Sequence, residues 1–275
     1  MLSNEEYTVV SQNAYIPEHL PRYVEAVSTA EPHLFGAYLC FTRENHLIFI
    51  GYPLGAEESD ISSSYESICE HFRPSTVAII APDFWLPAQS FEKQTEDIFY
   101  RLNLPLGPLS PEVAYMVRRA ARELHITQGR FEKEHMKLVK EFISGHKLSQ
   151  EHRIIFEHIP HYLKKSKSAR LLEARKGNSL VAFNIIELES ANYAFFLFNI
   201  RSIVYNIPGA SDLLFHEMVK LAQSEGKIAI NLGLGIHPGV RHFKEKWGGI
   251  PFLKYTYALV SRQPVPLGNL YEKIC

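Results

Sequence analysis

Apolar and polar residues recur along the chain with two periods, and these periods predict a mixture of helices and strands. Apolar residues spaced three and four apart, typical of amphipathic helices, occur in segments 17–30, 62–73, 131–143, 149–163, 208–226 and 237–249. Short runs rich in β-branched and aromatic residues, typical of strands, occur in segments 34–41, 47–54, 75–82, 123–127, 191–200, 227–235 and 252–260. Residues 169–188 add a hairpin with its turn at Lys176-Gly177-Asn178. The pattern predicts a protein of the α/β (α+β) class.

The second half of this series has the order β-α-α-β-β-β-α-β-α-β. In such an arrangement a strand leads into a helix that returns to a neighbouring strand, and ligands bind where the ends of those strands diverge. The preceding segment 84–112 is rich in proline, leucine and aromatic residues and receives no assignment. Within it, residues 102–112 carry prolines at a density that excludes a long helix or a central strand. We therefore expect a domain boundary near residue 115, with one domain over 1–115 and a second over 116–275.

The two halves carry opposite charges although the net charge of the whole chain is only −1. Residues 1–120 hold 7 basic and 16 acidic residues, whereas residues 121–275 hold 22 basic and 14 acidic residues. This asymmetry fits two alternatives, complementary docking of the halves or an anionic partner of the basic half. Cofactor phosphates, tRNA and a lipid headgroup all qualify as that partner.

Cysteines and apolar runs bear on the compartment. The three cysteines are widely spaced and form no CxxC pair, which argues against a disulfide framework or a zinc site. The N-terminus has no basic and apolar leader, and the longest apolar runs fall far short of the roughly 20 residues of a membrane-spanning helix. We expect a cytoplasmic protein without a transmembrane segment.

A string in the second half carries a family resemblance. It reads Asn231-Leu-Gly-Leu-Gly235, followed by Gly239-Val-Arg-His-Phe-Lys-Glu-Lys-Trp-Gly248. A strand ending in small residues before a helix of the pattern F-K-x-x-[FW]-G is similar to the closing segment of Fem-type peptidyltransferases. The resemblance extends to GNAT-like proteins related to the C-terminal domain of phosphatidylglycerol lysyltransferases. Residues 51–54, Gly-Tyr-Pro-Leu, add a less specific likeness.

Members of that family look like two fused GNAT units, so the resemblance implies a tandem GNAT-like (acyl-CoA N-acyltransferase) fold with mixed central sheets flanked by helices. It also implies transfer of an acyl or aminoacyl group to an amine-bearing acceptor, with acyl-CoA or aminoacyl-tRNA as the donor. The alternatives are a tRNA-dependent or lipid aminoacyltransferase and a non-catalytic binding protein that retains the fold. Candidate partners are tRNA and an anionic lipid headgroup.

The loop before the 208–226 helix is the expected place for the phosphates of a donor. Unpaired N–H groups at a helix start favour an anion, and a glycine lets the backbone approach it, which selects Gly209, Ala210 and Ser211. The loop 205–211 holds a single glycine and departs from the [QR]-x-x-G-x-[GA] loop of common acetyltransferases, which weighs against ordinary CoA binding. The alternative is an ordinary helix start capped by Ser211 or Asp212.

The glycines at the following strand end are further candidates. Gly233 and Gly235 either open the backbone for a donor arm or an oxyanion, or simply turn the chain into the next helix. Asn231 begins this segment and is counted with the catalytic candidates.

The helix after these glycines carries the charged candidates. In Fem-like enzymes the lysine of F-K has been linked to the reacting end of the donor, so Lys244 is the first candidate for binding phosphate or stabilising charge. Arg241 lies three residues earlier and is expected to share its face and bind the donor. His237 or His242 is a candidate general base, because histidine titrates in the needed range. The other histidines in the second half match no metal signature, so no metal is expected.

Overall fold

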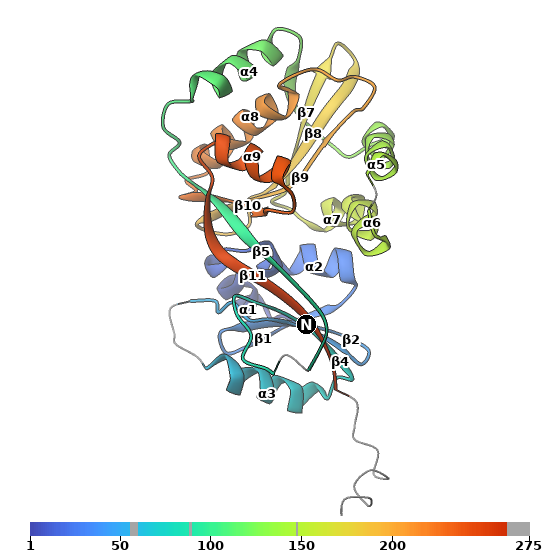
Figure 1. Cartoon of the computed structure of the whole chain (residues 1–275), viewed down its shortest axis with the longest axis vertical. Coiled ribbons are helices and arrows are strands. Elements are labelled where there is room, and N and C mark those ends of the chain that lie inside the picture. Colours follow the sequence, from blue (N-terminus) through green and yellow to red (C-terminus); the bar gives the residue numbers. More distant parts are fainter. Residues whose placement is uncertain (56–59, 88–89, 147, 263–275) are drawn as a thin grey trace, which may run out of the picture. The chain divides into compact units, whose positions relative to one another are not determined.

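The computed structural model describes residues 1–55, 60–87, 90–146 and 148–262. The chain divides into two compact units. Unit 1 takes in the described parts of 1–6, 30–97 and 254–262, and unit 2 those of 7–29 and 98–253. Helix α1 (Asn4–Asn13) and strands β5 (Phe91–Asn103) and β11 (Ile250–Ser261) each contribute residues to both units (Figure 1).

Unit 1 contains a sheet with the strand order β1-β2-β3-β4-β11. Its other elements are β1 (Glu31–Phe35), β2 (Tyr38–Arg43), β3 (His46–Ile50), α3 (Ile61–Phe72) and β4 (Thr76–Ala81). Alternate strand residues such as Phe49 and Ile79 face α3 and pack with Tyr65 and Ile68 of that helix. Helix α3 begins after Asp60, whose side chain accepts the Ser62 N–H at 3.0 Å.

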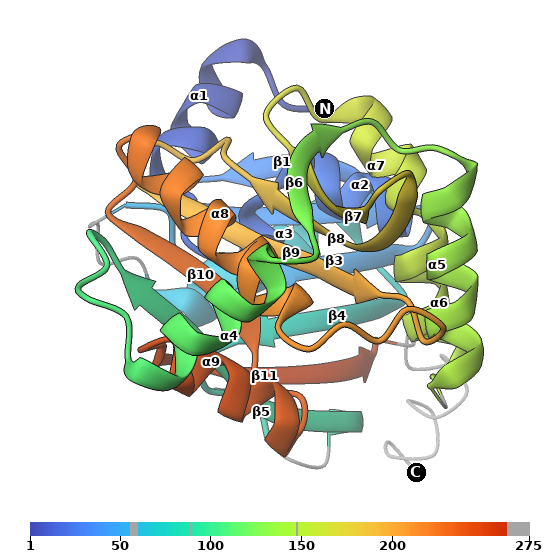
Figure 2. The ribbon, with the colours of Figure 1, turned by 90° about the horizontal axis from the view of Figure 1, so that it is seen from above.

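Unit 2 contains a sheet with the strand order β5-β10-β9-β8-β7-β6. Its remaining strands are β6 (His125–Gly129), β7 (Arg170–Lys176), β8 (Ser179–Glu187), β9 (Tyr193–Arg201) and β10 (Ala229–Leu234). Its helices are η1 (Pro17–His19), α2 (Pro21–Ser28), α4 (Pro111–Ala121), α5 (Lys133–Gly145), α6 (Gln150–Glu157), α7 (Ile159–Lys165), α8 (Ala210–Ser224) and α9 (Pro238–Lys246). Helices α5, α6 and α7 lie on one side of β7–β9, and α4 and α8 lie on the other (Figures 1 and 2).

Strand β8 shows why unit 2 has a core on each face of its sheet. Phe183 and Ile185 point to one face and pack with residues of α2, α5 and α7. Ala182 and Ile186 point to the other face and pack with α4 and α8. Side chains of successive strand residues point to opposite faces, so a strand that is apolar throughout must be covered on both sides.

The division into units differs from the domains expected at 1–115 and 116–275. Residue 115 lies inside α4, and α4 packs through Val113, Val117 and Ala120 into the core that α8 also enters, so it belongs to unit 2. Residues 7–29 also belong to unit 2, because Leu20 and its neighbours pack on β9. An assignment by position in the chain could not anticipate this return of the N-terminal segment.

Most predicted elements are present, with the following differences. The helix expected over 17–30 is divided into η1 and α2, and helices α1 and α4 were not predicted. The strand expected over 34–41 is wrong, because the chain turns at Gly36, where φ is +55°, and forms β1 and β2. The helix expected over 149–163 is divided into α6 and α7, with Pro160 in the first turn of α7. Segment 84–112, left without an assignment, contains the long strand β5. Two details are confirmed: Ser149 caps α6, and Gly226, with φ of +71°, follows the end of α8.

The structure bears on the expectations about the cysteines and about membrane-spanning helices. Cys40 and Cys69 are free and buried in unit 1, and Cys275 lies outside the described residues. Within the described ranges, every helix is too short or too polar to cross a bilayer.

Candidate donor site in unit 2

Strands β9 and β10 of unit 2 are parallel neighbours that stop pairing soon after they begin. They pair only at Tyr193–Ala229, Ala194–Ile230 and Phe195–Asn231. Beyond these positions β9 continues to Arg201 and pairs with β8, while β10 continues to Leu234 and pairs with β5. In this described stretch, the backbone edges that face each other past Phe195 and Asn231 are therefore not joined in a ladder. Their N–H and C=O groups are the kind that an extended amide-bearing ligand can pair with.

Unit 1 contains the same strand–helix–strand arrangement in a closed form. Strands β3 and β4 are parallel, are connected through α3, and pair at every position from His46–Thr76 to Ile50–Ile80. The Gly51 N–H extends this pairing by donating to the Ile80 carbonyl at 2.7 Å. The open pair of strands therefore distinguishes unit 2 from unit 1.

The start of α8 holds the three residues predicted to bind phosphate. Gly209 is the N-cap and has φ of +83°, so no side chain caps the first N–H groups of α8. The predicted alternative, a cap by Ser211 or Asp212, is wrong. A Cβ atom on Gly209 would lie 2.4 Å from the Met116 carbonyl oxygen, so the close approach of α4 already requires a glycine here.

The other two predicted phosphate-binding residues are tied into local contacts. The Ala210 N–H donates to the Ile207 carbonyl at 3.2 Å, and the Ala210 side chain is buried. The Ser211 hydroxyl accepts a hydrogen bond from Asn199 Nδ2 at 2.9 Å, which links the start of α8 to the outer part of β9.

Asp212, which the sequence places close to this candidate anion site, is buried and compensated. Its Oδ1 lies 2.7 Å from Lys246 Nζ and accepts a hydrogen bond from Trp247 Nε1 at 2.9 Å. These contacts join α8 to the end of α9. Because Lys246 neutralises the carboxylate, Asp212 does not oppose an anion at the start of α8.

The end of β10 is held by the Asn231 carboxamide. Asn231 Nδ2 donates to the Tyr15 carbonyl at 2.8 Å, and Asn231 Oδ1 accepts the Gly233 N–H at 2.7 Å. Gly233 has φ of +74° and lies at the bulge where the pairing of β10 with β5 shifts register. The Gly235 N–H donates to the Ile98 carbonyl at 3.1 Å. Asn231 therefore positions the turn and ties it to the N-terminal segment.

Lys244 lies beside this turn and is only 4% exposed. Its Nζ donates to the Leu234 carbonyl at 2.5 Å and lies 5.7 Å from the centre of the Tyr100 ring. A Cβ atom on Gly233 would be 3.8 Å from that Nζ. The structure thus brings Asn231, Gly233 and Lys244 together and places a cation at the end of β10.

The remaining charged candidates lie on the outer side of α9. Arg241 and His242 are exposed while Lys244 is buried, so the two basic side chains expected on one face of α9 have different surroundings. His237 is the N-cap of α9, and its Nδ1 accepts the Val240 N–H at 3.4 Å. The neutral ring then carries its proton on Nε2, and His237 cannot accept a second proton at Nδ1 without giving up the cap.

Aromatic residues missed by the sequence analysis surround the outer part of β9. The Phe196 ring lies 6.4 Å from Phe243 of α9 and 5.2 Å from Phe215 of α8. Trp247 packs 4.8 Å from Phe215. Phe196 and Phe243 are half-buried, so this apolar cluster is partly open to a ligand. Phe196 comes directly after Phe195, the last residue of β9 that pairs with β10. The sequence does not reveal where these strands diverge, and so it does not mark Phe196 as a candidate for ligand contact.

A cluster of charged residues on α5 and β7 of unit 2 lies away from the β9–β10 strand ends. Among the described residues, Glu134, His135 and Glu173 have ligand atoms close enough for a metal ion. Arg175 Nε, however, donates to Glu173 at 2.5 Å and its guanidinium also pairs with Glu134, while His135 Nε2 lies 3.1 Å from Glu173. The carboxylate charges are already compensated, and we assign the cluster a structural role.

Comparison with known proteins rests on structure alone. No known family model matches the chain, and no curated protein sequence is significantly similar to it. Among solved structures, FemX is similar with 13% identity and a TM-score of 0.65, covering 99% of each chain. The C-terminal domain of a putative lysylphosphatidylglycerol synthetase from Agrobacterium fabrum is similar with 15% identity and a TM-score of 0.59, covering 99% of this chain and 97% of the other.

A tandem GNAT protein from the clavulanic acid biosynthesis pathway is similar with 10% identity and a TM-score of 0.53, covering 82% of this chain and 79% of the other. The first two likenesses span nearly the whole of both chains, and the third joins them to proteins made of two GNAT units. The fold expected from the Asn231–Gly248 string is therefore confirmed. The chain has the GNAT-like, Fem-type fold.

Proposed function

We propose that unit 2 binds an activated acyl or aminoacyl donor between β9 and β10 and transfers the acyl group to a primary amine. The observation that carries this proposal is the end of strand pairing at Phe195–Asn231. A sheet normally satisfies its backbone groups by pairing, so two parallel neighbours that part leave room for an outside chain to supply the partners. The closed β3–β4 pair of unit 1 supports unit 2 as the donor-binding unit.

The residues at these strand ends have chemistry that suits such a donor. The uncapped start of α8 and exposed Arg241 offer N–H groups and positive charge to donor phosphates. Phe196 and Phe243 offer apolar contact to a donor arm. The Lys244 ammonium lies beside the Gly233 turn, and a cation held in place stabilises a developing oxyanion, so we assign this group to the donor carbonyl.

Two kinds of similar structure support two different classes of donor. One similar structure is a tandem GNAT protein described without AcCoA, which supports an acyl-CoA donor. The others are FemX and a lysylphosphatidylglycerol synthetase domain, and the latter name supports an aminoacyl group and a lipid acceptor. Both classes of donor present an activated ester or thioester carbonyl to the amine. A cytoplasmic location, expected from the sequence, suits either donor and stays a prediction.

A transfer assay tests the proposal. The full chain is incubated with acyl-CoAs of different lengths or with charged tRNA, together with amino acids, polyamines and aminolipids, and amide products are detected by mass spectrometry. We expect Arg241→Ala to raise the donor KM about tenfold, on the order of 1.4 kcal/mol of phosphate contact. The matched control is Lys164→Ala, which changes an exposed side chain of α7. An absence of amide product with every donor contradicts the proposal, and the chain is then a binding protein.

A second candidate, tRNA as the carrier of the donor, is favoured by a groove along α5. The groove is lined by Lys133, Met136, Lys137, Lys140, Glu141 and Ser144. Its three lysines are exposed and follow one another at helical spacing, which forms a positive stripe that suits a phosphodiester backbone.

The tRNA candidate is tested by binding at several salt concentrations. If the stripe contacts the backbone, the affinity for tRNA falls steeply with salt, and changing all three lysines to alanine reduces both affinity and salt slope. Lys220→Ala, on exposed α8 surface, should change neither. Undetectable binding at low salt, or identical slopes for the triple variant and wild type, excludes this route.

A further inference from the structure

The N-terminal segment of unit 2 crosses the sheet at the point where β9 and β10 part. The Tyr15 carbonyl accepts the Asn231 carboxamide, and Asn231 is the last residue of β10 that pairs with β9. Ala14 and Leu20 pack against Phe195, which is the last residue of β9 that pairs with β10. Two independent contacts therefore place the one-turn helix η1 beside the divergence of the strands.

Glu18 lies at the middle of η1 and has a carboxylate that the protein does not satisfy. Its Oε2 is shielded from solvent and has no hydrogen-bond partner among the described residues. Its own backbone N–H donates to the carboxylate and lowers the pKa, but by less than burial raises it. An unpaired buried carboxylate oxygen costs on the order of several kcal/mol unless the group becomes neutral or gains a partner. The residue as a whole is half-buried.

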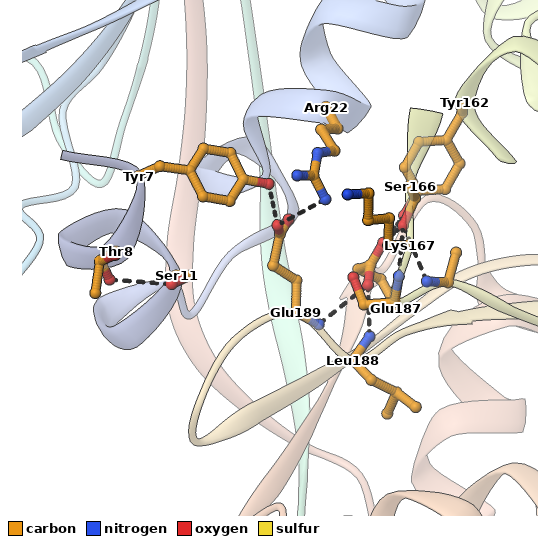
Figure 3. Close-up of polar contacts among 12 residues, drawn as sticks. Tyr7, Thr8, Ser11, Arg22, Tyr162, Ser166, Lys167, Glu187, Leu188 and Glu189 are labelled. Atoms are coloured by element: carbon orange, nitrogen blue, oxygen red, sulfur yellow. Dashed lines mark hydrogen bonds and ion pairs between the residues drawn. The ribbon is translucent and has the colours of Figure 1, made fainter. Parts of the chain in front are cut away.

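Two other carboxylates of unit 2, those of Glu187 and Glu189, have hydrogen-bond or ion-pair partners. Glu187 accepts hydrogen bonds from the Tyr162 and Ser166 hydroxyls and from the N–H groups of Leu188 and Glu189 (Figure 3). The Glu189 carboxylate accepts from the Tyr7 hydroxyl and pairs with Arg22 at 3.4 Å. These two side chains hold the end of β8 to α1, α2 and α7. Among the described residues, Glu18 Oε2 has no such donor.

Aromatic side chains lie near Glu18, and within the part of the chain that the structure describes no cation offsets its charge. Burial raises the pKa of Glu18 to about 7, and the carboxylate in turn raises the pKa of Tyr23. His19 is buried against Tyr15 on the same turn. A carboxyl group that titrates near neutral pH can take up and release a proton under ordinary conditions.

We propose that Glu18 receives the ammonium group of the acceptor and takes its proton. This inference rests on the transfer function proposed above. One N–H proton passes from the ammonium to the Glu18 carboxylate, and the freed nitrogen lone pair forms a bond to the donor carbonyl carbon. The bond from that carbon to the leaving sulfur or oxygen then breaks with its electron pair. The second nitrogen proton goes to the leaving group, so the products are an amide, a thiol or alcohol, and protonated Glu18.

The transfer reaction tests this role through its pH dependence. Glu18→Gln is expected to lower kcat at least 100-fold, within the usual range for loss of a general base, and to leave the donor KM unchanged. Wild-type kcat should fall below about pH 7 as Glu18 becomes protonated, and the variant should lose that limb. Glu18→Asp should recover part of kcat, and Glu112→Gln on exposed α4 surface should match wild type. A Glu18→Gln variant with kcat within threefold of wild type, or with the same acid limb, overturns the role.

A second measurement works without any transfer activity and so separates the two proposals. The melting temperature of the full chain is measured at pH 8 with increasing n-butylammonium chloride, with sodium chloride added to constant ionic strength. Wild type should be stabilised by the ammonium, since a ligand that binds the folded state raises its stability, and Glu18→Gln should not respond. Equal responses of wild type and Glu18→Gln overturn the inference. If wild type responds selectively but yields no amide with any donor, the proposed transfer fails while the ammonium site stands.

Discussion

At the scale of single residues, unit 2 contains buried carboxylates with opposite surroundings. Glu187 is fully hydrogen-bonded, and its negative charge and the burial of the ring hold the pKa of Tyr162 well above its ordinary value. Glu18 has an oxygen without a partner, and burial alone dominates its titration. The first arrangement stabilises the fold, whereas the second destabilises the charged form and suits a group that meets a ligand.

Removal of the Glu187 carboxylate should destabilise the protein strongly. Glu187→Ala leaves two hydroxyls and two backbone N–H groups without their acceptor, and we expect a loss of about 3–5 kcal/mol in the free energy of unfolding. Urea unfolding measures this loss, with Glu112→Ala as an exposed control expected within about 0.5 kcal/mol of wild type. A loss below about 1 kcal/mol would show that these contacts contribute little.

Glu18 should make stability depend on pH in the opposite direction to an ordinary ion-paired acid. Its pKa in the folded state is raised to about 7 from 4.5, so the folded state holds the proton more tightly than the unfolded state. The stability that the neutral form contributes is complete below the unfolded pKa of 4.5 and is lost as pH rises through about 7. The measured quantity is the difference in unfolding free energy between Glu18→Gln and wild type.

That difference should grow in favour of Glu18→Gln by up to about 3 kcal/mol between pH 4.5 and pH 8. Glu112→Gln serves as the control and should track wild type throughout. A difference that stays constant across this range would mean that Glu18 titrates as in the unfolded chain.

At the scale of elements, α8 is positioned by close contacts at its start. Its start passes next to α4 at Gly209, and Asp212 in its first turn is joined to Lys246 and Trp247 after β10. These contacts therefore fix the start of α8, which connects β9 to β10, the two strands that separate. Contacts of this kind keep the strands apart without a ligand.

Gly209→Ala should be far more destabilising than a similar change at Gly226. Both glycines have positive φ, which costs a non-glycine residue roughly 1–2 kcal/mol. An alanine Cβ at Gly209 would also meet the Met116 carbonyl oxygen at 2.4 Å, whereas the space around Gly226 is open. We expect about 3 kcal/mol or more for Gly209→Ala and about 1 kcal/mol for Gly226→Ala by urea unfolding. Equal costs would contradict the close approach of α4.

The sequence predicted the elements of this region better than their contacts. Period and capping located α8 and its closing Gly226, because these signals are local. The same signals missed β5, whose first half is exposed and charged and so lacks the apolar alternation of a buried strand. They also explained Gly209 by the approach of a phosphate. They could not reveal its close contact with α4, because that contact depends on a segment about 90 residues away in the sequence. Asn231 and Lys244, two of the catalytic candidates, lie beside Gly233 in the structure through hydrogen bonds that depend on tertiary contacts, which the sequence does not reveal.

At the scale of the whole molecule, the described residues contain the parallel strand–helix–strand arrangement twice, with β3 and β4 closed and β9 and β10 open. The β3–β4 pair in unit 1 is hydrogen-bonded along its length, and the β9–β10 pair in unit 2 is not. Unit 1 therefore serves as an internal reference for unit 2, since a ligand that needs open strand edges can enter only one of them. The similarity to FemX and to a lysylphosphatidylglycerol synthetase domain establishes the fold, and the difference between the units points to the site.

The most direct test of a donor between β9 and β10 is amide hydrogen exchange with and without a donor. The full chain is compared alone, with acetyl-CoA, and with a non-hydrolysable amide analogue of aminoacyl-tRNA, by mass spectrometry of the peptides. We predict that one of the donors slows exchange in peptides covering 196–211 and 231–244, because a bound donor pairs with backbone groups that are otherwise open. Peptides covering β3 and β4 should be unaffected. Protection of the β3–β4 peptides instead, or no protection by either donor, would contradict the account.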